Sequence, residues 1–316
     1  MLTLGTQPLV SVVIPVYNRA HIISRALDSV IAQNYANIEI ILVDDCSCDS
    51  LELQEVLKQY SNVDLTYIRH KTNLHGSAAR NTGIARAKGE YIALLDSDDN
   101  WCTSKIEVCL RTLSENDVDF VYSQVQKIGV QKGIVPLFPR KANETYSDYL
   151  LVRNGSIQTS TLFLKRSVFD KIQFDENLVR FQDYDFVLSL ELIKATSFFI
   201  PEVLVYMYDD DQAGRISNSF DYQPAVYWHN KVKYLLSKRA ANSFLVSRIC
   251  QYMIYSGKRL TAMSILFNPV VFLYTNKSFW SKVLLVLLVP RQLLLLIKLL
   301  IYRLKNTTKA LFNQND

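Results

Sequence analysis

The chain has 316 residues and a net charge of +5, with 49% hydrophobic and 21% charged residues. This apolar content excludes an intrinsically disordered chain, and nine Gly and eight Pro are too few for a collagen-like or linker-rich architecture. Five Cys without a CxxC pair argue against a disulfide framework or a zinc ribbon.

The first half of the chain alternates apolar runs with stretches of helical periodicity. Strands are expected at Leu9–Val16, Ile38–Val43, Leu65–Arg69 and Tyr91–Leu95. Helices are expected at Ile22–Ile31, Leu51–Tyr60 and Ser77–Lys88. Strands separated by helices of this length indicate βαβ units, so we predict an α/β fold with a mostly parallel central sheet flanked by helices. No GxGxxG or GxxxxGK motif follows any of these strands, which excludes the dinucleotide-binding and P-loop patterns.

Polar clusters follow three of the predicted strands. Tyr17-Asn18 follows the first strand, Asp44-Asp45 the second, and Asp96-Ser97-Asp98-Asp99 the fourth. The carboxyl ends of parallel strands lie along one edge of an open α/β sheet and line its ligand crevice. We therefore expect these clusters to converge on one site.

The acidic clusters allow two interpretations each. The three carboxylates of the 96–99 cluster would repel one another unless a cation lies between them, and a hard divalent ion completed by substrate phosphates satisfies this. The alternative is a turn that caps a helix starting near Thr103. Asp44-Asp45 could cap the helix at Leu51–Tyr60, or a carboxylate there could accept a hydrogen bond from a base N–H.

Four segments resemble family 2 glycosyltransferases with the GT-A fold, in particular those of bacterial O-antigen and capsular polysaccharide synthesis. They are VSVVIPVYNR (10–19), IILVDDCSCD (40–49), GSAARNTGIARAKGEYIALLDSDDNW (76–101) and FDENLVRFQDYDF (174–186). Two positions depart from the family pattern: Cys46 stands where Gly is usual, and Gln182 stands where Glu is usual before the Asp.

The resemblance implies a UDP-sugar donor, a divalent cation (Mn²⁺ or Mg²⁺), and a hexosyl- or N-acetylhexosaminyltransferase activity. It places Pro15, Tyr17 and Asp45 around the uracil and ribose. Asp96 would contact the ribose side, and Arg80 would help to hold the nucleotide or form a salt bridge on its helix. Asp98, with Asp99, would bind the metal. Less specific similarities place Arg215 and Ser217 near the donor phosphates, and Thr159 and Ser160 beside the acceptor.

Asp183 is the candidate general base. It lies between Phe181 and Phe186, and burial among aromatic side chains raises a carboxyl pKa and makes it a better proton acceptor. By resemblance, Asp183 takes the proton of an acceptor hydroxyl in a single displacement that inverts the anomeric configuration. The alternative is that Asp183 caps the helix carrying Phe186–Leu192. Asp185 is expected to be a second acid of that helix.

The C-terminal segment is basic. Residues 222–316 contain 14 Lys and Arg and one acidic residue, Asp316. Within 279–305, Arg291, Lys298 and Lys305 recur every seven residues, which places them on one stripe of a Leu- and Ile-rich helix. We predict a peripheral amphipathic helix on an anionic membrane surface, at the cytoplasmic face of the inner membrane because the N-terminus shows no signal peptide. A dimer interface or a buried helical pair is the alternative.

Together these features predict that the chain is divided into three parts. Residues 1–125 would form the nucleotide-sugar-binding half of a GT-A domain, 126–221 its acceptor-binding half, and 222–316 a helical membrane-associated segment. The predicted activity is inverting sugar transfer to a glycan hydroxyl, on an undecaprenyl-diphosphate-linked acceptor, in bacterial surface polysaccharide synthesis. Alternatives are a protein or soluble glycan acceptor, or a non-catalytic nucleotide-sugar-binding module. No nucleic-acid partner is expected, and the oligomeric state is left open.

Overall fold

A computed structural model describes residues 7–129, 132–208 and 221–274. Contacts between Cα positions divide the chain into two compact units, one with residues 1–150 and 155–211 and the other with 151–154 and 212–316. The predicted helix within 279–305, and Arg215 and Ser217, lie outside the described residues.

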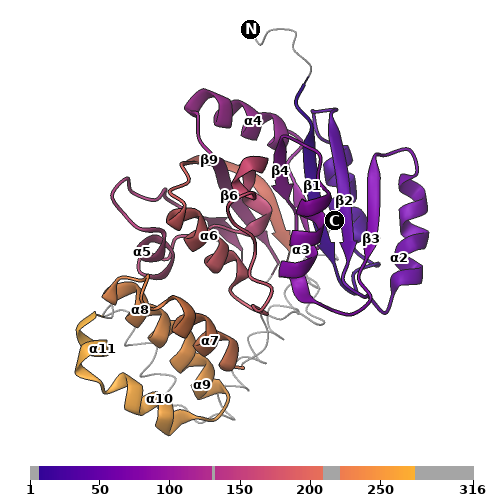
Figure 1. The fold of residues 1–316 in the computed structure, drawn as a ribbon. Helices are drawn as coiled ribbons and strands as arrows, with labels where there is room; N and C mark the ends of the chain where they lie inside the picture. Colours follow the sequence, from indigo (N-terminus) through magenta and orange to yellow (C-terminus); the bar gives the residue numbers. More distant parts are fainter. Residues whose placement is uncertain (1–6, 130–131, 209–220, 275–316) are drawn as a thin grey trace, which may run out of the picture. The chain divides into compact units, whose positions relative to one another are not determined.

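The first unit begins with alternating strands and helices, as the sequence predicts (Figure 1). These elements are β1 (Val10–Val16), α1 (Ile23–Ile31), β2 (Ile38–Asp44), α2 (Ser50–Leu57), β3 (Leu65–Arg69), α3 (His75–Arg86) and β4 (Tyr91–Leu94). The β1 segment VSVVIPV is buried at every position except the half-buried Pro15. Burial on both faces explains its continuous apolar run, which is typical of parallel strands covered by helices.

The remainder of this unit adds five strands to the same sheet. Its elements are β5 (Asp99–Trp101), α4 (Lys105–Asn116), β6 (Phe120–Ile128), β7 (Gly133–Val135), α5 (Tyr146–Leu151), β8 (Phe163–Lys165), α6 (Gln182–Leu192) and β9 (Ser197–Tyr208). Three 3-10 turns, at Lys58–Tyr60, Thr159–Thr161 and Arg166–Val168, lie between these elements. None of β5, β6, β7 and β9 was predicted from the sequence.

The sheet is mixed rather than mostly parallel. Its strand order is β3-β2-β1-β4-β8-β6-β9-β5, with β7 paired to β6. The β1–β2, β2–β3, β1–β4 and β6–β9 pairs are parallel, and the other four are antiparallel. The prediction was wrong for the second half, where each antiparallel pair includes a strand of three residues (β5, β7 or β8) that is too short to show periodicity. The longer strands β6 and β9, which were also missed, form a parallel pair.

Helix α3 packs closely on β1 and β2, and Figure 1 shows it in front of these strands. Gly83 makes this approach possible, because a Cβ atom there would lie 2.4 Å from Val13 Cγ1. Since α3 also carries Arg80, this close packing fixes one candidate site residue relative to the sheet.

The second unit is helical over its described residues. Its elements are α7 (Gln223–Val232), α8 (Lys238–Phe244), a π-helical turn (Leu245–Cys250), α9 (Gln251–Tyr255), α10 (Arg259–Leu266) and α11 (Pro269–Tyr274). Trp228 and Phe244 pack together in its core, with ring centroids 4.6 Å apart. No helix among the described residues is long and apolar enough to cross a bilayer.

Candidate active site

Strand registers bring the three predicted polar clusters to one edge of the sheet. Val16 of β1 is paired with Asp44 of β2, and Val13 of β1 is paired with Leu94 of β4. The segments that leave these three strands therefore start side by side at their carboxyl ends, which confirms the shared edge predicted from the sequence.

The two acids after β2 have different environments. Asp44 is fully buried, and its carboxylate accepts hydrogen bonds from the Ser47 N–H (2.8 Å) and the Tyr67 hydroxyl (2.8 Å). Asp45 Oδ1 instead accepts the N–H of Leu74 (2.8 Å) and lies 2.8 Å from His70 Nδ1. Asp44 therefore stabilises the turn. Helix α2 has Asp49 as its N-cap residue, so neither acid caps that helix.

His70 orients Asp45. Its second ring nitrogen, Nε2, lies 2.9 Å from the Thr82 hydroxyl of α3, so both ring nitrogens have partners. The sequence analysis placed no chemistry on His70. Its position one residue after β3, at the same sheet edge, was the signal that could have identified it.

The loops after β1 and β2 each contain a residue in a left-handed backbone conformation. Asn18 has φ +53°, and its N–H donates to the Ser47 hydroxyl at 2.9 Å. Cys46 has φ +64°, a left-handed conformation in which glycine is favoured, which gives a physical reason for the usual Gly at this position. Tyr17 is 46% exposed at this edge, beside the half-buried Pro15.

Arg80 connects the end of β4 to the start of α6. Its Nη2 donates to Asp96 Oδ1 at 2.6 Å, and its Nη1 donates to Gln182 Oε1 at 2.8 Å. The arginine is 8% exposed and lies over the Phe174 ring, with Cζ 5.5 Å from the ring centroid. The predicted surface salt bridge is therefore a part-buried bridge between two segments of the candidate site.

The 96–99 cluster does not cap the next helix, whose N-cap residue is Ser104. Asp99 lies in β5, is 3% exposed, and accepts a hydrogen bond from the Ser160 hydroxyl at 2.6 Å. The Asp98 side chain is half-buried, and its main-chain oxygen accepts from Arg25 Nη2 at 2.8 Å. Of these two neighbours, Asp98 is the one less enclosed by protein.

Ser160 has a structural role that the sequence did not reveal. It is fully buried in the 3-10 turn before β8, where its Oγ also accepts the N–H of Asp96 at 3.1 Å. Ser160 thereby joins Asp96 to Asp99. The expected place of Ser160 beside the acceptor stays a prediction.

The described residues could supply only some of the ligands that a divalent cation needs. Among the described residues, no group of three His, Cys, Asp or Glu side chains is placed to hold a metal ion. A Mg²⁺ or Mn²⁺ ion at a nucleotide site needs only one or two carboxylates, because phosphate oxygens and water complete its shell. Asp98, which is half-buried, fits this requirement better than Asp99, which is 3% exposed within β5.

Asp183 lies in the first turn of α6. Phe181, two residues earlier, has a left-handed backbone conformation (φ +63°). Aromatic side chains surround this region: Phe174 stacks on Phe186 with ring centroids 4.1 Å apart, and Phe181 contacts Tyr184. Burial raises the pKa of Asp183, opposed by hydrogen bonds from backbone N–H groups and by the positive charge of Arg80. The negative charge of Asp96 raises it further. This is the direction expected from the sequence.

Asp185, two residues further, is buried within the same helix. The α6 helix starts at Gln182, and Phe181 is its N-cap residue. Asp183 therefore occupies the first helical turn without being the cap residue. The capping alternative is therefore wrong, although an acid in the first turn is favoured by the helix dipole.

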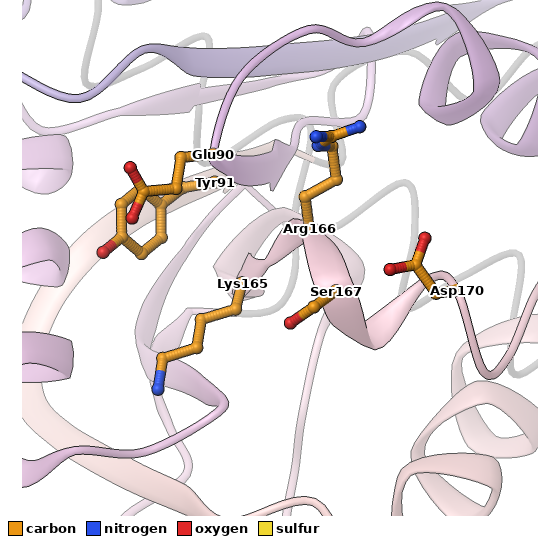
Figure 2. Close-up of a pocket in the computed structure, with 6 residues that line it drawn as sticks. All are labelled: Glu90, Tyr91, Lys165, Arg166, Ser167 and Asp170. Atoms are coloured by element: carbon orange, nitrogen blue, oxygen red, sulfur yellow. The ribbon is translucent and has the colours of Figure 1, made fainter.

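Figure 2 shows a separate pocket of about 250 Å³, lined by Glu90, Tyr91, Lys165, Arg166, Ser167 and Asp170. Tyr91 is the first residue of β4, so this pocket lies at the amino end of that strand. None of the predicted site residues lines it.

A scan against protein-family models matches residues 11–173 to "Glycosyl transferase family 2", which is more than half of the chain. The chain is 34% identical over 277 residues to the amylovoran biosynthesis glycosyltransferase AmsB of Erwinia amylovora, a match that covers 85% of this chain and 91% of AmsB. It is 32% identical over 182 residues to WfgD of Escherichia coli, a UDP-Glc:alpha-D-GlcNAc-diphosphoundecaprenol beta-1,3-glucosyltransferase. That match covers 58% of this chain and 69% of WfgD.

The fold is similar to that of solved structures. The structure of S. aureus TarS 1-349 in complex with UDP-GlcNAc superposes with a TM-score of 0.60 at 20% sequence identity, covering 83% of this chain and 76% of that one. At this identity the likeness concerns the fold alone: a mixed α/β sheet flanked by helices, of the GT-A type.

Proposed function

This chain belongs to glycosyl transferase family 2, and we propose that it transfers a sugar from a UDP-linked donor to a hydroxyl group of a glycan. The observation that carries the proposal is the Arg80 bridge. It joins Asp96, at the sheet edge, to Gln182, which directly precedes Asp183 in α6. The bridge thus links the edge where a nucleotide sugar would bind to an acid with a raised pKa.

The donor nucleotide is assigned to the carboxyl ends of β1, β2 and β4. Tyr17 and Pro15 offer an exposed ring and an apolar edge for the uracil. Asp45, held by His70 and Leu74, is assigned as the acceptor for the base N–H. Asp96, held by Arg80, is assigned to the ribose side. The relative WfgD, whose name specifies a UDP-Glc donor, supports UDP as the nucleotide.

Asp98 is assigned to the divalent cation, together with oxygens of the donor diphosphate. When bound, the ion supplies positive charge that stabilises the departing diphosphate. Asp99 remains a candidate ligand from the sequence. We favour Asp98 alone because Asp99 is enclosed in β5 and paired with Ser160.

Asp183 is assigned as the general base. A carboxyl group with a raised pKa accepts a proton better, and Asp183 would accept the hydroxyl proton as the acceptor oxygen forms its bond to the anomeric carbon. The bond between that carbon and the UDP oxygen breaks in the same displacement, so the configuration inverts. Holding both substrates in line contributes the entropic part of the rate enhancement.

The acceptor is proposed to be a lipid-linked glycan of a bacterial surface polysaccharide. The names of AmsB and WfgD support this class: one states amylovoran biosynthesis and the other a diphosphoundecaprenol acceptor. The second unit supports membrane attachment. Residues 222–274 contain no Asp or Glu, and Leu260 and Phe267 are among its exposed apolar side chains. Peripheral binding at the cytoplasmic face would bring Asp183 to such an acceptor.

The test is sugar transfer by the full chain with a panel of nucleotide sugars, followed by Asp183→Asn. We expect UDP release that depends on an acceptor, and a loss of rate in Asp183→Asn of about 10²–10⁴-fold with UDP affinity unchanged. Residual transfer above one tenth of the wild-type rate would refute the role of Asp183. No turnover with any donor, together with intact UDP binding, would instead indicate a non-catalytic module. Lipid-linked and soluble acceptors compared at equal concentration separate the two acceptor classes.

A further inference from the structure

Both polar atoms of the Gln182 side-chain amide make hydrogen bonds. Its Oε1 accepts from Arg80 Nη1 at 2.8 Å, and its Nε2 donates to the Leu178 main-chain oxygen at 2.7 Å. A glutamate at this position would keep the contact with Arg80. Its second oxygen would, however, face the Leu178 carbonyl without a proton to donate. The surroundings of residue 182 therefore specify an amide in this chain.

A glycine of helix α3 lies close to both partners of the Arg80–Gln182 contact. A Cβ atom at Gly76 would lie 3.0 Å from Arg80 Nη1 and 3.1 Å from Gln182 Oε1, closer than ordinary van der Waals contact. Gly76 is thus packed against both partners of the bridge. Any side chain there would displace the guanidinium, the amide or both, so the backbone of α3 fixes the distance between them.

Arg80 has one charged and one neutral side-chain partner. Its guanidinium is nearly buried and ion-paired with Asp96, while its contact with Gln182 is to a neutral group. Arg80 of α3 and Asp96 after β4 are the charged groups that shift the pKa of Asp183, in opposite directions. A carboxylate at residue 182 would add a second negative charge next to Asp183 and cancel part of the positive charge of Arg80.

We propose that Gln182 is a positioning residue that holds the Arg80 guanidinium against Asp96, and that its neutral amide leaves the positive charge of Arg80 acting on the neighbouring Asp183. This inference rests on the proposed function, since it concerns the acid assigned as the general base. It goes beyond that function by giving a role to the position where the chain departs from the family pattern.

The first test is the pH dependence of kcat/KM for wild type and Gln182→Glu, with Gln173→Glu as the matched control. Gln173 is exposed, so the same change of charge there is screened by water. We expect the acid limb of the profile to move up by about one pH unit in Gln182→Glu and to stay in place in Gln173→Glu. An unmoved limb in Gln182→Glu would overturn the proposal.

A steric variant tests the positioning without a change of charge. Gly76→Ala should lower kcat by about tenfold and also raise the donor KM, because it displaces Arg80, which holds Asp96 on the ribose side. Wild-type kcat in Gly76→Ala would contradict the positioning role.

A double-mutant cycle in urea unfolding needs no turnover. A carboxyl whose pKa is raised on folding destabilises the protein once the pH exceeds its unfolded pKa, so Asp183→Asn should stabilise the protein at pH 7 relative to pH 4. This gain should be larger in a Gln182→Glu background than in wild type. Equal gains in both backgrounds would overturn the electrostatic coupling. Absence of sugar transfer by wild type would count against the proposed function and leave this cycle as the test of the coupling.

Discussion

Asp98 and Asp99 are adjacent in the sequence, but the fold gives them different surroundings. Asp99 is 3% exposed and bonded to Ser160, whereas Asp98 is half-buried. Asp99 is the first residue of β5, whereas Asp98 lies in the turn before it, so one is enclosed by the sheet while the other is more accessible. The two acids should therefore respond differently to substitution.

We expect Asp98→Ala to weaken UDP binding in the presence of Mn²⁺ or Mg²⁺ by at least about tenfold, with little change in stability. Asp99→Ala should instead lower the free energy of unfolding by about 2 kcal/mol, because it leaves the buried Ser160 hydroxyl without its acceptor. Calorimetric UDP titration and urea unfolding measure the two effects. The opposite pattern would assign the metal to Asp99.

Lys105 is a buried cation with no role in the proposed chemistry. Its Nζ lies 3.3 Å from the Thr161 main-chain oxygen, 3.8 Å from Cys109 Sγ and 4.9 Å from the centroid of the Trp101 ring. Burial lowers the pKa of Lys105, and Cys109 only partly opposes this effect. The residue also starts α4, where a positive charge is disfavoured by the helix dipole.

A lysine whose pKa falls on folding destabilises the protein below its unfolded pKa, so wild-type stability should rise with pH toward about 10. Lys105→Met removes the buried amine and should raise the free energy of unfolding by about 1 kcal/mol at pH 7. The advantage should shrink at pH 9.5. Urea unfolding at both pH values measures it, and a difference that is independent of pH would contradict the assignment.

At the scale of elements, α3 connects the core to the candidate site. The helix packs on β1 and β2 through Gly83 and carries Thr82, which contacts His70, and Arg80, which contacts Asp96 and Gln182. A change in the separation between helix and sheet is therefore expected to reach the site through these side chains.

Gly83→Ala tests this close packing. The added methyl group would lie 2.4 Å from Val13 Cγ1, and overpacking of this kind costs about 1–3 kcal/mol in spite of the better helix propensity of Ala. Thermal or urea unfolding should show the loss, and Val13→Ala in the same chain should recover part of it. Strictly additive effects of the two substitutions would show that the methyl groups do not meet.

At the scale of the whole molecule, the two units differ in charge. Residues 222–316 hold 14 basic residues and one acidic residue, although the chain as a whole carries 30 acidic residues. In the second unit, Leu260 is 83% exposed and Phe267 76% exposed, and Lys258 and Arg259 directly precede Leu260. Exposed apolar and basic side chains in one unit are the combination that favours an anionic lipid surface.

We expect the full chain to float with anionic vesicles and not with neutral ones, and binding to fall as salt is raised. Leu260→Asp with Phe267→Asp should weaken vesicle binding by about tenfold, because two apolar contacts are lost and two negative charges are added. Leu51→Asp, at a 78% exposed position of α2 in the first unit, is the matched control and should bind as wild type. Equal binding by all variants would place the lipid contact elsewhere.

The sequence by itself determined the parallel first half of the sheet and the acids at its edge, because periodicity and strand-terminal clusters are local patterns. It also indicated the raised pKa of Asp183, since its aromatic neighbours lie in the same segment. The antiparallel strands, the enclosure of Asp99 by Ser160, and the Arg80–Gln182 contact were decided only by the tertiary structure. The two side-chain contacts join residues separated by 61 positions or more, and each antiparallel pair includes a strand of three residues. Local propensity carries no information about such pairings.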